Sequence, residues 1–220
     1  MDKYLNRKHA GQILADALKK YSARHDVIVL ALPRGGVPVA YKIAQTLQAP
    51  LDVFIVRKLG VPEHVELAMG AIATGDTTVF NQDIISQLGI SIAQINAVIE
   101  NEKIELQRRE QVYRGNHVFP VLKNKIVILV DDGIATGATM RVAINAVRKF
   151  SPAKLIVAVP VSDITICQEM EKMVDEFVCP ICTSQLNAVG VWYDDFSQTE
   201  DAEVHELLQN ARKFVTIAQK

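Results

Sequence analysis

The feature that most constrains this sequence is an unbroken run of five apolar residues, Ile126 to Val130, most of them β-branched. A short apolar run of this kind is typical of a strand that is buried on both faces in the middle of a parallel sheet. Asp131 and Asp132 follow it directly. Both carboxylates are therefore expected at the carboxyl edge of the sheet, where open α/β sheets bind their ligands.

The loop after the two acids suits a phosphate group. Residues 135–139 include a glycine and two threonines, and residues 140–149 have the periodicity of a helix. A glycine-containing turn at a helix N-terminus presents free backbone N–H groups, and the helix dipole adds to their attraction for an anion. A ribose 5-phosphate has the matching groups, a phosphate and a vicinal diol. Paired Asp residues alone often cap a turn or hold Mg²⁺, and Thr-Gly pairs occur in many loops, but both in this register favour a functional interpretation.

Residues 127–139 resemble the phosphoribosyl-pyrophosphate (PRPP) signature of the type I phosphoribosyltransferase family. That signature has four apolar residues, two acids, three spacer positions and then Thr-Gly-x-Thr. Gly133 departs from the pattern, since many relatives carry a larger apolar residue there. The resemblance implies that Asp131 and Asp132 bind the ribose and Mg²⁺. It also implies that the 5-phosphate is bound by Ala135, Thr136, Gly137, Ala138 and Thr139.

A second apolar run carries candidate pyrophosphate ligands. Val27 to Leu32 predicts another central strand, and Arg34, Gly35 and Gly36 follow it before a helical pattern. Two glycines let the backbone approach a ligand closely, and Arg34 adds a positive charge. In the family a loop at this position holds pyrophosphate, and the Arg-Gly-Gly form is similar to that of xanthine-type enzymes. The alternative is an ordinary turn with a surface arginine.

A third predicted strand, Leu51 to Val56, ends in Arg57 and Lys58. Two cations at the carboxyl end of a strand would neutralise part of the charge of a pyrophosphate group. We therefore add both to the predicted pyrophosphate site. The alternative is that they are solvated, as basic pairs at strand ends usually are.

The segment of about 59–118 is expected to form an insert that closes over the site. Residues 59–66 have a loop composition, and residues 67–73 and 77–80 predict a β-hairpin. The resemblance implies a flexible flap here. Ala135 stands where hypoxanthine-, guanine- and xanthine-type relatives carry an Asp that handles the acceptor's proton. Either a residue of the flap has that role here, or the acceptor loses its proton unaided. The candidates, which are otherwise solvated surface groups, are Glu63, His64 and Glu66.

Residues 190–196 contain three aromatic side chains and two acids in a chain with only 6% aromatic residues. A core-packing aromatic strand would explain them. The resemblance implies instead a small hood, about 180–220, that selects the acceptor. The pattern of residues 202–219 predicts an amphipathic helix. The candidates for ring stacking are Trp192, Tyr193 and Phe196.

Cys179 and Cys182 form a CxxC pair, and Cys167 is the only other cysteine in the sequence. A zinc ribbon needs two such pairs, and a redox CxxC needs a thioredoxin-like context that is absent from the pattern. We interpret the pair as two buried thiols beside a strand.

The overall composition restricts the class of protein. The charges of the 24 basic and 25 acidic residues nearly cancel, so the composition lacks the excess of positive charge that is typical of nucleic-acid-binding proteins. No run approaches the ~18 apolar residues of a membrane span, and the first residues lack the apolar core of a signal peptide. An odd cysteine count fits a reducing cytoplasm better than a disulfide framework. We expect a cytoplasmic protein with neither a nucleic-acid nor a membrane partner.

Strands and helices alternate along the chain, which predicts an α/β fold with a doubly wound, mostly parallel sheet. With the flap and the hood, residues 1–220 are expected to form a single phosphoribosyltransferase-like domain. Residues 91–113 predict a long polar helix that is either half-exposed or part of a subunit contact. We expect a homo-oligomer, a dimer.

The resemblance implies transfer of ribose 5-phosphate from PRPP to a small nitrogenous acceptor, with Mg²⁺-bound pyrophosphate as the leaving group. The main alternative is a non-catalytic PRPP-binding regulator on the same fold. Such regulators need a basic face or an added nucleic-acid-binding domain, and neither the net charge of −1 nor residues 1–26 favour one. Two weaker alternatives are a DNA-uptake accessory protein, whose relatives carry four zinc-binding cysteines, and a structural protein with a vestigial site.

Overall fold

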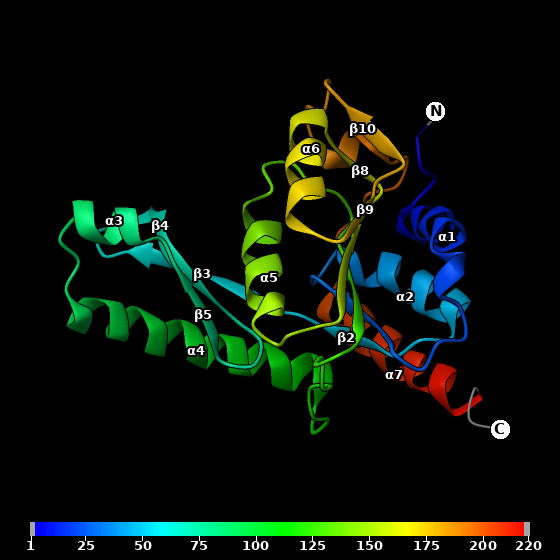
Figure 1. The fold of residues 1–220 in the computed structure, drawn as a ribbon, viewed down its shortest axis with the longest axis horizontal. Helices are drawn as coiled ribbons and strands as arrows, with labels where there is room; N and C mark the ends of the chain where they lie inside the picture. The colour runs from blue at the N-terminus through cyan, green and yellow to red at the C-terminus, as the bar shows by residue number, and fades with distance from the viewer. Residues whose placement is uncertain (1–2, 218–220) are drawn as a thin grey trace.

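Five parallel strands form the central sheet of the computed structural model, which describes residues 3–217 (Figure 1). Their order is β2-β1-β6-β7-β9, so β6 lies in the middle. Every residue of β1 and β6 is buried, because both faces of the sheet are covered. The predicted central strand that ends at Asp131 is confirmed. The strands are β1 (Val27–Ala31), β2 (Leu51–Val53), β6 (Ile126–Val130), β7 (Lys154–Ala158) and β9 (Glu176–Val178).

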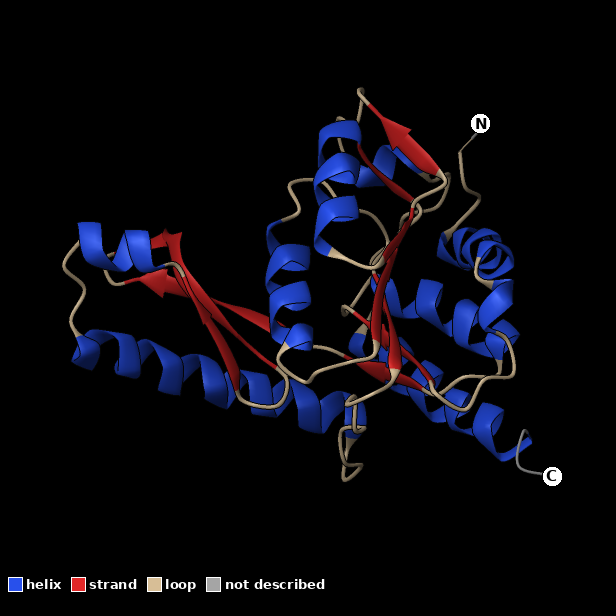
Figure 2. Cartoon of the chain, viewed as in Figure 1, coloured by secondary structure: helices blue, strands red, loops and turns tan. Residues whose placement is uncertain are grey.

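Helices cover both faces of this sheet, as Figure 2 shows. One face packs against α1, α2 and α7, with Leu14 and Ile43 in the shared core. The other packs against α5 and α6, with Met140 and Met170 in the core. The predicted doubly wound α/β fold is confirmed. The helices are α1 (Arg7–Ala17), α2 (Gly36–Leu47), α5 (Ala138–Arg148), α6 (Ile164–Met173) and α7 (Asp201–Ile217), with the short η1 (Lys19–Tyr21) after α1.

An arm projects from this body between β2 and β6 in the chain (Figure 1). Its small core contains Leu59, Met69 and Ile72, which pack against isoleucines of its two helices. The predicted β-hairpin over residues 67–73 and 77–80 is confirmed. The arm consists of β3 (Val56–Val61), β4 (His64–Ala73), β5 (Thr77–Phe80), α3 (Gln82–Gln87) and α4 (Ile92–Arg114).

The prediction of a loop over residues 59–66 is wrong. β3 continues to Val61, and the chain turns at Pro62 and Glu63 into β4. Leu59 and Val61 are buried in the arm core, as expected for one face of a strand. A glycine and a proline within the same segment gave it the composition of a loop.

A small lobe, which we call the hood from here on, lies beyond the sheet edge. It does not include α7, which belonged to the predicted hood of about 180–220 but packs against the central sheet. It contains the parallel pair β8 (Val161–Asp163) and β10 (Ile181–Thr183), η2 (Val189–Trp192) and the N-terminal segment around Tyr4. The mostly apolar run of residues 154–161 is divided between two strands that belong to different sheets, β7 and β8. Pro160 lies between them, and it has no N–H to continue a ladder. Residues 190–196 form η2 and an irregular segment, so the alternative of an aromatic strand is wrong.

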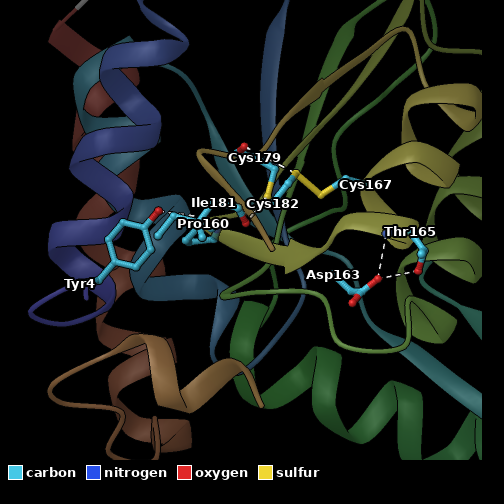
Figure 3. The surroundings of a disulfide bond; sticks show 8 residues. All are labelled: Tyr4, Pro160, Asp163, Thr165, Cys167, Cys179, Ile181 and Cys182. Atoms are coloured by element: carbon cyan, nitrogen blue, oxygen red, sulfur yellow. Dashed lines mark hydrogen bonds between the residues drawn. A yellow bond between two sulfur atoms is a disulfide. The ribbon is translucent and has the colours of Figure 1, made fainter. Parts of the chain in front are cut away.

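Cys167 of α6 and Cys182 of β10 form a disulfide (Figure 3). The expectation of two buried thiols at Cys179 and Cys182 is wrong, since Cys182 is exposed and bonded, whereas Cys179 is partly buried and free. The partners are 15 residues apart, and the packing of α6 against β10 brings them together.

Within residues 3–217, the structure contains no helix long and apolar enough to cross a membrane. The C-terminal helix begins at Asp201, one residue before its predicted start. Its predicted end, Gln219, lies outside the described residues.

Candidate functional site

Asp131 and Asp132 lie at the carboxyl end of β6, as predicted. Asp132 Oδ2 accepts a hydrogen bond from Arg7 Nε at 2.8 Å, and its backbone carbonyl accepts one from the Tyr193 hydroxyl at 2.6 Å. Asp131 Oδ1 accepts one from the backbone N–H of Asp132 at 2.8 Å. The acid pair is therefore held in place by residues from both ends of the chain.

The surroundings of Asp131 disfavour its negative charge. Burial and the adjacent Asp132 carboxylate raise the pKa of Asp131 well above its usual range. A cation bound between the two carboxylates, or hydroxyl groups that donate to them, would relieve this repulsion. Mg²⁺ is commonly held by one or two carboxylates together with water and phosphate oxygens. The residues present therefore fit Mg²⁺.

The glycine turn after β1 packs directly against the acid pair. β1 and β6 are neighbours in the sheet, so the loops that follow them meet. A Cβ atom on Gly35 would lie 1.9 Å from Asp132 Oδ2, and one on Gly36 would lie 2.8 Å from the carbonyl oxygen of Val130. Neither position has room for a side chain. The backbone of this turn therefore lies against Asp132 and the end of β6, and its close approach to a ligand remains a prediction.

Residues 135–139 line a small cavity beside Asp131. Its volume is about 190 Å³, and the loop from Gly133 to Met140 forms its wall. Gly137, with φ of 76°, precedes the first turn of α5, and no side chain caps this helix. The backbone N–H of Ala138 makes only a long contact, 3.5 Å, with Thr136 Oγ1, and those of Thr139 and Met140 have no side-chain partner among the described residues, which suits a phosphate site. The binding of a 5-phosphate here remains a prediction.

Arg141, in the first turns of α5, fixes the position of this loop. Its Nη1 donates a hydrogen bond to the carbonyl oxygen of Thr136 at 2.9 Å. Its Nε and Nη2 donate to the carboxylate of Glu169 on α6. A guanidinium that binds a carboxylate with two nitrogen atoms has a fixed orientation, so the loop is tied to α6 through Arg141.

Arg34 lies in the same turn as the two glycines, and the peptide bond before it is cis. Its Nη1 is 3.6 Å from Asp201 Oδ1 at the start of α7. Arg34 lines a second cavity, with a volume of about 180 Å³, together with Arg108 and Arg109 of α4. Three guanidinium groups therefore gather next to the glycine turn, although Arg34 itself points toward α7 in this structure.

The other two predicted cations lie in the arm. Arg57 and Lys58 are within β3, so the expectation that they end a core strand is wrong. The chain leaves the central sheet after Val53 and continues directly into β3. Arg57 Nη2 pairs with Glu102 Oε2 at 2.7 Å, and Lys58 Nζ is 3.7 Å from Glu66 Oε2. Their contact with pyrophosphate remains a prediction.

Glu63, His64 and Glu66 are exposed at and after the turn between β3 and β4. At this end of β4, His64 pairs with Val61 of β3, which is buried in the arm core. At the opposite end of β4, Ala73 packs in the core of the central sheet. The three residues therefore lie at the outer end of the arm. The structure does not bring them to the acid pair.

The aromatic residues of the hood lie beside Asp132. The Tyr193 ring packs against those of Tyr4 and Phe196, with centroids 5.4 and 5.0 Å away. The guanidinium of Arg7 lies 3.9 Å from the centroid of Phe196. Trp192 packs against the hood core from its edge. Acceptor binding by Trp192, Tyr193 and Phe196 remains a prediction.

Sequence reasoning missed Arg7 and Arg141. Arg7 is 125 residues from its partner Asp132, and no local pattern connects them. Arg141 could have been found, because a long side chain in the first turns of a helix points back toward the preceding loop.

Comparison with known proteins shows which family the chain belongs to. A family model described as "Phosphoribosyl transferase domain" matches residues 71–195, which include the acid pair and the phosphate loop. The chain belongs to the phosphoribosyltransferase family. The resemblance inferred from residues 127–139 is thereby confirmed.

Individual known proteins resemble most of the chain. Two Mycobacterium tuberculosis proteins, whose names place them among the phosphoribosyl transferases, are 44% identical over 209 residues. The match covers 94% of this chain and 47% of theirs, so the chain spans about half their length. The crystal structure of TT1426 from Thermus thermophilus is 33% identical, with a TM-score of 0.83, and the match covers 94% of this chain and 98% of that one. Bifunctional protein PyrR of Clostridium acetobutylicum is 24% identical over 66% of this chain and 62% of its own.

Proposed function

We propose that this protein is a Mg²⁺-dependent phosphoribosyltransferase that transfers the ribose 5-phosphate of PRPP to a small nitrogenous acceptor and releases pyrophosphate. One observation carries the proposal. The acid pair after β6, the Gly35–Gly36 turn after β1 and the uncapped start of α5 meet at one edge of the sheet. PRPP has a diol, a pyrophosphate and a 5-phosphate that match these three features.

Each part of this edge has a separate task. Asp131 and Asp132 would hold the ribose hydroxyls, directly or through Mg²⁺, and the ion would neutralise charge on the leaving pyrophosphate. The start of α5 with Thr136 and Thr139 would hold the 5-phosphate. Arg34 and the backbone of the glycine turn would bind the pyrophosphate. The oxocarbenium-like transition state needs little covalent help, so catalysis would come from orientation and from charge stabilisation.

Ala135 restricts the acceptor. It is exposed at the start of the phosphate loop, and its methyl side chain cannot accept a proton. We infer that hypoxanthine, guanine and xanthine are poor acceptors, because their transfer needs a base at this position. Either Glu63, His64 or Glu66 reaches the acceptor after a movement of the arm, or the acceptor loses its proton unaided.

The test is pyrophosphate release from PRPP with Mg²⁺ over a panel of bases and amines. We expect at least one acceptor other than the three 6-oxopurines to support turnover. Alanine replacement at Glu63, His64 and Glu66 should lower the rate ~10²–10⁴-fold at one position, the usual contribution of a general acid or base. Efficient turnover of guanine would contradict the inference from Ala135. Full rates in all three variants would exclude the arm as the source of the base.

A PRPP-binding protein without transferase activity is the second candidate. The observation in its favour is that the predicted acid–base residues of the arm lie away from the acid pair in this structure. The same panel separates the two candidates. PRPP binding with no pyrophosphate release for any acceptor would support the second.

A further inference from the structure

Three cysteine sulfur atoms meet where α6 packs against the hood. The Sγ atoms of Cys167, Cys179 and Cys182 all lie within 4.8 Å of one another. Figure 3 shows these three side chains and the disulfide between Cys167 and Cys182. They belong to α6, to the segment after β9 and to β10. Cys167 and Cys182 are joined as a disulfide, and Cys179 keeps its thiol beside them.

The third sulfur atom is not needed for the disulfide, yet the fold holds it against the other two. The Cys179 thiol donates to the carbonyl oxygen of Ile181 at 3.3 Å, within the tight turn that Pro180 begins. Burial raises the pKa of this thiol to about 12, and backbone hydrogen bonds at Ile181 and Ser162 act in the opposite direction.

The hood needs a cross-link. β8 and β10 form a two-stranded sheet, which is marginally stable by itself. The hood nevertheless positions the acid pair, because Tyr193 donates to the carbonyl of Asp132, and it anchors the N-terminal segment, because Tyr4 donates to the carbonyl of Pro160 at 2.8 Å. A disulfide between α6 and β10 provides the link under oxidising conditions. Reduction of that bond would leave three thiols whose sulfur atoms the fold already places close together.

We propose that the reduced hood binds one thiophilic cation of the zinc class through Cys167, Cys179 and Cys182. Zinc–sulfur bonds of ~2.3 Å in a tetrahedral site place the sulfur atoms ~3.8 Å apart, which needs only small shifts from the observed cluster. Cys182 is exposed, so a water molecule completes the fourth position. Soft thiolates select zinc-class ions, and the carboxylates at the sheet edge select Mg²⁺, so the two sites take different metals.

The Cys167–Cys182 disulfide must be reduced before the metal binds, and a phosphine can reduce it. The disulfide accepts two electrons from a phosphine, which becomes a phosphine oxide with an oxygen atom from water, and the two sulfur atoms gain two protons. The three thiols then lose three protons as three metal–sulfur bonds form. In the cell a dithiol that becomes a disulfide would supply the same two electrons.

Cobalt(II) is the probe for the metal site. Full-length protein is reduced with a phosphine, freed of metal and titrated with Co²⁺ without oxygen. We expect one equivalent to give the sulfur-to-cobalt charge-transfer band and the strong visible absorption of a tetrahedral site. Stoichiometric Zn²⁺ should remove both and protect all three thiols from Ellman's reagent. The unreduced protein should show neither band.

Two variants make the test specific. Asp131→Asn with Asp132→Asn should keep the cobalt–thiolate spectrum, because the proposed site is independent of the Mg²⁺ site. Cys179→Ser should lose it, and this variant can still form the Cys167–Cys182 disulfide, so its fold can be checked in the oxidised state. The proposal is overturned if reduced wild-type protein shows no charge-transfer band and its thiols react equally fast with and without Zn²⁺. It is also overturned if Cys179→Ser gives the wild-type spectrum.

Discussion

Replacement of Arg7 by methionine should destabilise the free protein and tighten its binding of PRPP with Mg²⁺. The Arg7 and Asp132 side chains are only 11% and 16% exposed, and they are joined by a 2.8 Å hydrogen bond. Charge-assisted hydrogen bonds contribute ~1.5–3 kcal/mol. Methionine keeps an unbranched side chain beside Phe196 and removes the donor, so a loss of ~2 kcal/mol in the free energy of unfolding is expected. For a chain of this size that lowers the melting midpoint by ~4–8 °C.

The effect on binding follows from a thermodynamic cycle. Arg7 occupies Asp132 Oδ2, the atom proposed to bind the ribose or Mg²⁺. If the ligand must displace Arg7, the substitution raises the free energy of the free protein more than that of the complex. The difference, up to ~2 kcal/mol, appears as affinity that is up to ~30-fold higher.

The assay combines thermal melts with calorimetric titration of PRPP in the presence of Mg²⁺. Lys8→Met is the matched control, because Lys8 is the exposed neighbour of Arg7 in α1. The control should change neither the melting midpoint nor the affinity by a measurable amount. An Arg7→Met variant that melts lower but binds PRPP equally or less tightly would refute the reasoning, since Arg7 would then remain in place or contact the ligand.

Three other predictions follow from the site and the core. Arg34→Ala should weaken pyrophosphate and PRPP by ~1.5–3 kcal/mol and spare ribose 5-phosphate; equal losses for all three ligands would place Arg34 elsewhere. Arg141→Met should weaken ribose 5-phosphate binding and spare pyrophosphate, because it removes the hydrogen bond that holds the carbonyl of Thr136 in the phosphate loop. Calorimetry should show ~10-fold weaker binding of ribose 5-phosphate and unchanged binding of pyrophosphate. Burial raises the pKa of Glu176, but hydrogen bonds from Lys154, Lys20 and Tyr21 together lower it from 4.5 to about 2. The stability that Glu176 contributes is therefore complete above its unfolded pKa and is lost as the pH falls toward about 2. Glu176→Gln should lower the free energy of unfolding by ~1–3 kcal/mol at pH 7 and should reduce the loss of stability that wild-type protein shows on acidification. An unchanged loss of stability on acidification would contradict the assignment.

The parts of the site that were predictable are contiguous in the sequence. Ile126 to Val130 can be recognised as a buried strand because both faces of the strand are covered, so every position carries an apolar residue. The acid pair and the phosphate loop follow within nine residues, so their geometry depends on one strand, one turn and one helix. The glycine turn after β1 was predictable for the same reason, and adjacent parallel strands brought it to the acid pair.

The parts that were not predictable depend on packing between distant segments. Arg7 reaches Asp132 because α1 and the hood lie beside the sheet edge, which no local pattern records. Arg57 and Lys58 lie in the arm because the chain leaves the core soon after β2, and a short core strand followed by an arm strand has the composition of one longer strand. The disulfide joins α6 to a strand of the two-stranded sheet, and that sheet was itself unexpected.

Calorimetric titration of PRPP, with and without Mg²⁺, into the wild-type protein and the Asp131→Asn, Asp132→Asn double variant tests the central claim most directly. The wild-type protein should bind PRPP only with Mg²⁺, and at ~100 times Kd the ligand should stabilise the fold by ~2.7 kcal/mol. The double variant should keep its fold, because both side chains lie beyond the buried strand, and should lose the binding. No heat and no thermal shift for the wild-type protein at millimolar PRPP with Mg²⁺, or normal binding by the double variant, would contradict the claim that this acid pair is a PRPP site.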